Sequence, residues 1–213
     1  MLERLKTLSE LYGVSGNETR VRAYLRREAA PLADETFVDP VGNLYVHQRG
    51  EGRRVMLAAH MDEVGMIVRD ITEAGTLLYE AGGIDARVVV SKRVVVGPNG
   101  VPGVIGAKAI HLQTPEERKR ALKHTDLYVD IGAKDRVDAE KLVARGDYIS
   151  FTTRFSAFGD GLVRGKALDD RVGCAILLEL LKNRYDCDLW AVFTVQEEVG
   201  LRGAKPAAWA VDP

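Results

Sequence analysis

The stretch LWAVFTVQEEVG, residues 189–200, joins a continuous apolar run to a pair of carboxylates. A short run of large apolar and β-branched residues is typical of a strand buried on both faces of an α/β sheet. A second such run, VMLAA at residues 55–59, is also followed closely by polar residues. The two runs predict core strands of one sheet, each ending in a loop that carries polar side chains.

Helical periodicity flanks these strands. The leucines of the first eleven residues recur at helical spacing, and glycines at 13 and 16 interrupt the pattern. Ser15 and Glu18 have the S-x-x-E spacing of a capping box, which predicts the start of a second helix there. A further helix is predicted after Gly165. The inner faces predicted for the second and the late helix comprise Val21, Tyr24 and Leu25, and Val172, Ile176 and Leu180.

A segment of different texture separates the two α/β parts. From Val64 to about Arg154, short valine-rich runs alternate with glycine and proline turns, which is typical of a β-barrel. Two short helices are predicted within it, one after the T-P-E-E capping sequence at Thr114 and one over residues 138–144. We therefore predict an α/β domain formed by residues 1–65 and 160–213, with an inserted β-rich domain at 66–159.

Composition excludes several classes of protein. Thirty Lys and Arg against 31 Asp and Glu give a net charge of -1, so no nucleic-acid or acidic-membrane partner is indicated. Apolar runs such as CAILLELL are too short and too interrupted by charge to span a bilayer, and the charged N-terminus is unlike a secretory signal. Two cysteines without paired spacing favour a soluble cytoplasmic protein with reduced thiols.

Three clusters of polar residues could bind a metal ion, and the first two also have a simple structural explanation. In AAHMDEVG, His60 and Asp62 lie two residues apart at a strand end, where an aspartate can orient a metal-bound imidazole. An ordinary strand-end turn is the alternative. In GKALDDRVG, Asp169 and Asp170 precede an apolar helix, so they can cap it or, through two oxygens of one carboxylate, join two cations.

The third cluster is the acidic pair that follows the opening strand. Glu197 and Glu198 project in different directions, so one can bind a cation while the other stays free, although a solvated loop would also accept two acids. Imidazole and carboxylate ligands suit Zn(II), Co(II) or Mn(II). Together the three clusters predict a two-metal hydrolytic site, in which cations acidify a water and a free carboxylate takes its proton.

The motifs HMDEVG, KALDDRVG and VQEEVGLRGA, in this order and with a β-rich insert between the first two, resemble those of the tetrahedral, deblocking-type metalloaminopeptidases. This group is also called the glutamyl aminopeptidase and cellulase-annotated family. The likeness extends to GVIGAKAIHL and DLYVDIGA within the insert. It implies a mixed-sheet, phosphorylase/hydrolase-like metallopeptidase domain with an inserted β-barrel-like domain.

The resemblance also implies roles for particular residues. His60, Asp169 and Glu198 match ligands of two divalent metal ions, Zn or Co, with Asp169 bridging both. Glu197 matches the general base, and Asp62 the residue that supports His60. A cis peptide after Asp169, a peptide substrate and a dimer-based homo-oligomer, a dodecamer in the family, are implied as well, with neither nucleic acid nor membrane as a partner.

One departure from the family pattern limits this carry-over. The family has a further aspartate ligand on the next strand and a late histidine, and the chain ends at Pro213 before either. We therefore expect a C-terminally incomplete domain, weak or partial metal occupancy and an uncovered sheet edge. Three hypotheses stay open: a metalloaminopeptidase, a non-catalytic fragment or assembly partner, and an endoglucanase-annotated relative. The sequence contains neither G-x-S-x-G nor a P-loop.

Overall fold

The computed structural model describes residues 1–213 and divides into two compact units. The first unit comprises Met1–Glu63 and Thr153–Pro213, and the second comprises Val64–Thr152. The first is an α/β unit and the second is a β-barrel, as the sequence pattern predicts. None of the helices combines the length and the apolar character needed to cross a membrane.

A four-stranded mixed sheet forms the centre of the α/β unit. Its strands, in spatial order, are β1 (Glu35–Val38), β2 (Leu44–Gln48), β12 (Asp188–Thr194) and β3 (Arg54–His60). Strand β12 pairs antiparallel with β2 and parallel with β3, and Thr194 lies opposite His60 in the register. The carboxyl ends of β3 and β12 therefore meet at one edge of the sheet.

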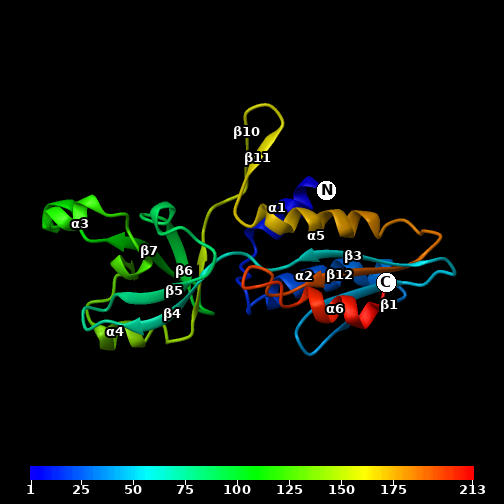
Figure 1. Ribbon diagram of the computed structural model, residues 1–213, viewed down its shortest axis with the longest axis horizontal. Helices are drawn as coiled ribbons and strands as arrows, with labels where there is room; N and C mark the ends of the chain where they lie inside the picture. The colour runs from blue at the N-terminus through cyan, green and yellow to red at the C-terminus, as the bar shows by residue number, and fades with distance from the viewer. The chain divides into compact units, whose positions relative to one another are not determined.

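Helices cover both faces of this sheet (Figure 1). The helices of the unit are α1 (Leu2–Glu10), α2 (Thr19–Ala29), α5 (Leu168–Leu180) and α6 (Ala204–Val211). Helices α1, α2 and α5 enclose the main core on one face, which includes Leu8, Leu25 and Phe193. Helix α6 covers the other face, where Val211 packs with Tyr45. Apolar burial on both faces explains the continuous apolar sequence of the central strands.

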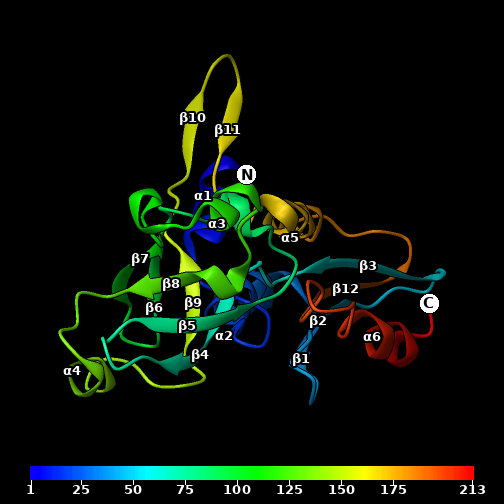
Figure 2. The ribbon, with the colours of Figure 1, turned by 60° about the vertical axis from the view of Figure 1, so that its left-hand side comes forward.

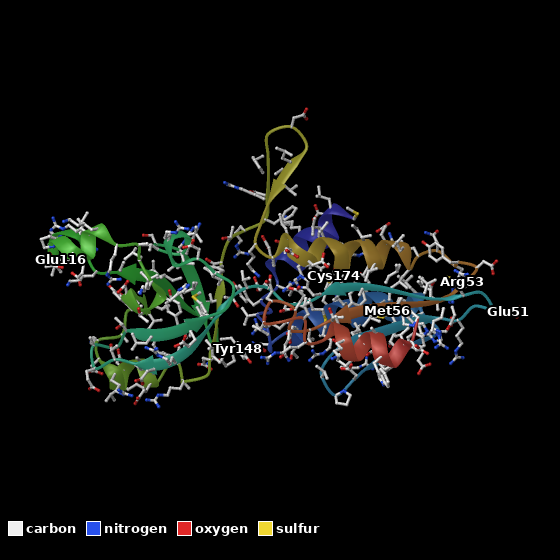
Figure 3. All side chains as sticks on the ribbon, viewed as in Figure 1. Glu51, Arg53, Met56, Glu116, Tyr148 and Cys174 are labelled. Atoms are coloured by element: carbon white, nitrogen blue, oxygen red, sulfur yellow. The ribbon has the colours of Figure 1, made fainter.

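The face that α5 buries differs from the predicted one. Val172 and Ile176 are 37% and 43% exposed, whereas Cys174 and Leu178 are fully buried against the sheet. The labelled Cys174 lies on the side of α5 that faces β3 (Figure 3). The helix carries apolar residues on more than one stripe, so periodicity predicts the helix but does not select the buried stripe.

The predicted capping box at the start of α2 is wrong. Helix α2 begins at Thr19, and Glu18 at its N-cap makes no capping hydrogen bond with its side chain. The Ser15 hydroxyl instead donates to Asp62, and the Glu18 carboxylate accepts from the amides of Gly16 and Gln196. Both residues therefore act in tertiary contacts rather than in local capping. The predicted inner face of α2 is confirmed, because Val21 and Leu25 are buried and Tyr24 packs partly against the core.

The second unit is a closed six-stranded antiparallel barrel. Its strands, in the order around the barrel, are β4 (Met66–Ile71), β5 (Leu77–Ala81), β8 (Leu127–Asp130), β7 (Val101–Ala107), β6 (Arg93–Val96) and β9 (Tyr148–Phe151). Alternate residues such as Val94, Ile105 and Val129 fill its interior. Closure pairs every strand on both sides and leaves no open edge.

Short helices and a hairpin complete the fold. The capping box between Thr114 and Glu117 is confirmed at the start of α3 (Pro115–Lys119), and α4 (Arg136–Glu140) begins earlier than the predicted 138–144. The strands β10 (Ser156–Phe158) and β11 (Leu162–Arg164) form a separate hairpin of the α/β unit, which stands apart from its sheet (Figure 2). The 3-10 helices are Ala30–Leu32, Ala86–Val88, Ile110–Leu112 and His124–Asp126.

Candidate metal centre

The polar clusters meet where β3 and β12 end. The amide of Met61, just after β3, donates to the carbonyl of Thr194 at 2.7 Å, so the two strands leave the sheet together. The loop after β12 carries Glu197 and Glu198, and the start of α5 brings Asp169 to the same place. Side chains from three distant parts of the sequence thus converge at the carboxyl end of a parallel strand pair, a common location for binding sites in α/β sheets.

His60 occupies the middle of this group and is buried. Its Nε2 lies 3.0 Å from an Asp169 oxygen and 3.8 Å from Glu197 Oε2, while its Nδ1 lies 3.4 Å from Asp62 Oδ1. Burial lowers the pKa of His60, but the adjoining carboxylates outweigh it and raise this pKa to about 9. At neutral pH the imidazole therefore carries a proton on both nitrogens, and a divalent cation bound at Nε2 would replace one of them.

Asp62 is fully buried and joins His60 to the acidic loop. Its carboxylate accepts hydrogen bonds from the Ser15 hydroxyl at 2.6 Å and from the amides of Glu197 and Glu198 at 3.0 and 3.1 Å. Burial raises the pKa of Asp62, yet the hydrogen bonds from His60, Ser15 and the two amides outweigh it and lower this pKa below its ordinary value. Asp62 therefore stays ionised and fixes both the imidazole and the loop.

The acidic pair lies close to the imidazole. One ligand atom each from His60, Glu197 and Glu198 lie within 4.8 Å of one another. Burial raises the pKa of Glu198; the positive charge of His60 opposes this shift, and the neighbouring anions Glu197 and Asp169 add to it. A divalent cation between these groups would relieve the repulsion, which is why like charges are tolerated at such sites.

The two aspartates at the start of α5 take different positions. Asp169 faces His60 with a side chain that is 88% exposed. Asp170 instead caps the helix, because its carboxylate accepts from the amide of Gly173 at 2.9 Å, and it also accepts from the amide of His60 at 3.2 Å. The Asp169–Asp170 peptide bond is cis, as the resemblance implies. Helix capping thus accounts for Asp170 but not for Asp169.

The residues present fit a divalent metal. One imidazole nitrogen and carboxylate oxygens from Glu197 and Glu198 lie within 4.8 Å of one another, with an Asp169 oxygen 3.0 Å from the imidazole, and these are donor types that Zn(II), Co(II) and Mn(II) accept. The structure thus brings together all five residues selected from the sequence, namely His60, Asp62, Asp169, Glu197 and Glu198.

Several supporting residues were missed by the sequence analysis. Lys166 and Glu63 form a buried ion pair at 2.8 Å, and the lysine also donates to the carbonyl of Leu11. Arg171 is fully buried and donates to the carbonyl of Leu8 at 2.6 Å. Ser15 and Glu18 were read as helix caps. The charged residues inside the motifs could have indicated such contacts, because a charged side chain that is buried requires a partner.

The structure thus combines an α/β unit, which carries a cluster of potential metal ligands, with an inserted barrel. Residues 42–213 match the M42 glutamyl aminopeptidase family, and the chain belongs to this family. It is similar to the TET aminopeptidase of a marine sediment archaeon of the Thaumarchaeota, with 39% identity and a TM-score of 0.95 over 100% of the chain and 63% of that protein.

Two further relatives support the same assignment. The TET1 peptidase of Pyrococcus horikoshii is 40% identical over 97% of the chain and 64% of that protein, with a TM-score of 0.88. The glutamyl aminopeptidase of Lactococcus lactis is 32% identical over 100% of the chain and 64% of that protein. The chain therefore spans somewhat less than two thirds of the length of these relatives.

Proposed function

We propose that the chain belongs to a dinuclear metal-dependent aminopeptidase that removes N-terminal residues from peptides. The observation that carries this proposal is the convergence of His60, Asp169, Glu197 and Glu198 where β3 and β12 end. Family membership supports the same reaction class. We also propose a cytoplasmic location, a homo-oligomeric state and peptide substrates. These three proposals follow from the family rather than from the site.

The proposed ligands are His60 for one cation, Glu198 for the other and Asp169 between them. Asp169 suits the bridging position because its carboxylate is 88% exposed and offers two oxygens, one of which lies 3.0 Å from His60 Nε2. When bound, Zn(II) or Co(II) ions would supply the Lewis acidity that polarises a scissile carbonyl and acidifies water.

Glu197 is the proposed general base. Its carboxylate would take a proton from the attacking water and return it to the leaving amine. The hydrogen bond from its amide to Asp62 fixes the backbone on which this carboxylate sits. Asp62 is proposed to hold His60 in the orientation that presents Nε2 to the centre, since its carboxylate lies beside Nδ1.

A matched pair of variants tests these roles. In the complete enzyme, Glu197→Gln should retain metal and lower turnover by about 10²- to 10⁴-fold, because the proton acceptor is lost. Glu198→Gln should weaken Co(II) binding instead. Metal affinity is measured by Co(II) absorption and turnover with an aminoacyl chromogenic substrate. Retained turnover in Glu197→Gln, or equal loss of metal in both variants, would show that the assignment of base and ligand is wrong.

The second candidate function is a non-catalytic piece or assembly partner. The chain covers 63 to 64% of the length of the relatives described above, so activity of the chain by itself is tested separately from that of the complete enzyme. Metal content and peptide hydrolysis of the 213-residue chain separate the candidates: robust activity at stoichiometric Co(II) or Zn(II) rejects the non-catalytic one, and its absence rejects activity of the chain on its own.

Assembly is proposed from a relative. The P. horikoshii TET1 peptidase can assemble into a tetrahedron or a large octahedral shell. By analogy we propose a dimer-based dodecamer for the protein to which the chain belongs. Light scattering coupled to size-exclusion chromatography measures the mass, and a strictly monomeric species at micromolar concentration would contradict the proposal.

A further inference from the structure

The connection between α1 and α2 contacts all three motif loops. Gly13 exchanges two hydrogen bonds with Glu63 of the first motif, and the Gly13 carbonyl also accepts from Arg171 of the second. Ser15 then binds Asp62, and Glu18 reaches the loop after β12. This short N-terminal connection therefore links segments that carry the metal-binding side chains, although it carries no candidate ligand itself.

Glu18 makes the contact with the third motif. Its side chain is buried, and one carboxylate oxygen accepts from the amide of Gly16 at 2.7 Å and from the amide of Gln196 at 3.2 Å. It makes no capping bond to α2, so local helix capping does not explain a buried charge at this position. Buried carboxylates are retained only where donors satisfy them, and here one donor belongs to the acidic loop.

The acidic loop has a backbone that needs such support. Gln196 has a positive φ of 54°, a left-handed backbone conformation that residues other than glycine rarely adopt. The amide of Gln196 binds Glu18, and the next two amides, of Glu197 and Glu198, bind Asp62. Three consecutive amides are thus held by two buried carboxylates. Asp62 holds two of them, and Glu18 holds the first, where the chain turns out of β12.

We propose that Glu18 is a positioning residue that fixes the Gln196–Glu198 backbone and so places the Glu197 and Glu198 carboxylates for metal binding and proton transfer. The inference rests on the proposed function for its catalytic consequence, but the backbone contact stands independently of it. Glu18 acts through the loop amides and touches neither substrate nor metal. What matters is the acceptor oxygen, so a glutamine should replace the glutamate and an apolar side chain should not.

Three variants separate positioning from packing. Glu18→Gln keeps an acceptor oxygen in the side chain, whereas Glu18→Leu keeps the buried volume but removes that oxygen. If Glu18→Leu does not fold, Glu18→Ala replaces it as the variant without an acceptor. Glu10→Leu is the matched control, because Glu10 also accepts from a distant amide, that of Phe155 at 3.2 Å, but does not contact the acidic loop. Folding of each variant is checked by circular dichroism.

The first measurement needs no metal. Amide hydrogen exchange of Gln196, followed by ¹⁵N-resolved NMR of the 213-residue chain, should accelerate about tenfold or more in Glu18→Leu, since a hydrogen bond to a charged group is lost. Exchange should stay close to the parent rate in Glu18→Gln and Glu10→Leu. Unchanged exchange at Gln196 in Glu18→Leu overturns the proposal.

The second measurement uses Co(II). Glu18→Leu should weaken Co(II) binding by about 10- to 100-fold and alter the Co(II) absorption bands, as loss of a supporting contact does at metal sites. Glu18→Gln should restore both, a rescue that loss of packing would not give. Parent affinity and spectrum in Glu18→Leu overturn the positioning role. If the parent chain binds no Co(II), the proposed function fails for this chain, and the exchange measurement alone decides the role of Glu18.

Discussion

Replacing Lys166 by methionine tests whether the buried ion pair supports the α/β unit. Lys166 Nζ lies 2.8 and 2.9 Å from the two oxygens of Glu63 and 2.7 Å from the carbonyl of Leu11, and the side chains of the pair are 5% and 2% exposed. Burial lowers the pKa of Lys166 and outweighs the opposing effect of Glu63, so the charged pair is expensive to bury. Methionine would leave the Glu63 charge buried without its cation.

The expected loss follows from that unpaired charge. Breaking a buried pair on one side costs about 3–5 kcal/mol of the free energy of unfolding. With a denaturant slope of about 2 kcal/mol/M, the urea midpoint should fall by about 2 M. Both tryptophans, Trp190 and Trp209, belong to the α/β unit, so tryptophan fluorescence follows the unfolding of that unit. A double variant, Lys166→Met with Glu63→Leu, should recover much of the loss, because no charge is left unpaired.

An exposed ion pair supplies the control. Lys182 binds Glu179 at 2.6 Å, but their side chains are 46% and 40% exposed, so Lys182→Met should change the unfolding free energy by less than about 1 kcal/mol. The reasoning is refuted if Lys166→Met unfolds within about 1 kcal/mol of the parent, or if the double variant is no more stable than the single one.

Three further outcomes are expected. Leu178→Ala should destabilise the chain by about 2–5 kcal/mol in urea, whereas Ile176→Ala should cost far less, because only Leu178 is buried; equal losses would contradict the observed face of α5. Hydrogen bonding from His47 lowers the pKa of Asp188 to about 2 from 3.8, so its contribution to stability is present above pH 3.8 and is lost as the pH falls through about 2. The stability gap between parent and Asp188→Asn, measured by acid-dependent unfolding, should therefore narrow over that range, and a constant gap argues against it. EDTA should abolish hydrolysis by the complete enzyme and Co(II) should restore it, while activity that survives EDTA would favour a two-carboxylate glycosidase.

Periodicity and motif order predicted the elements better than their contacts. The apolar runs at 55–59 and 189–195 form β3 and β12 because residues buried on both sides of a sheet leave a continuous apolar signal. The buried face of α5 could not be predicted from the sequence, because apolar residues occur on several sides of that helix. The prediction for Ser15 and Glu18 was wrong because their S-x-x-E spacing fits a capping box, although both side chains make long-range contacts.

The candidate site could be predicted from the sequence for a related reason. Imidazole and carboxylate groups placed directly after buried strands meet at one edge when those strands are parallel neighbours, so His60 and Glu198 were predictable from their sequence context. The buried charges Glu63, Lys166 and Arg171 were not, because nothing in the local sequence states which distant carbonyl or carboxylate satisfies them. The catalytic roles of the individual residues stay predictions.

The sheet of the α/β unit has an open side that the closed barrel lacks. Strand β3 pairs with β12 alone, and Val55, Met56 and Leu57 along it are only partly buried. An unpaired strand with apolar side chains is a template for added strands from another molecule. Because that same strand ends at His60, a strand added along this edge would lie beside the element that carries a candidate ligand.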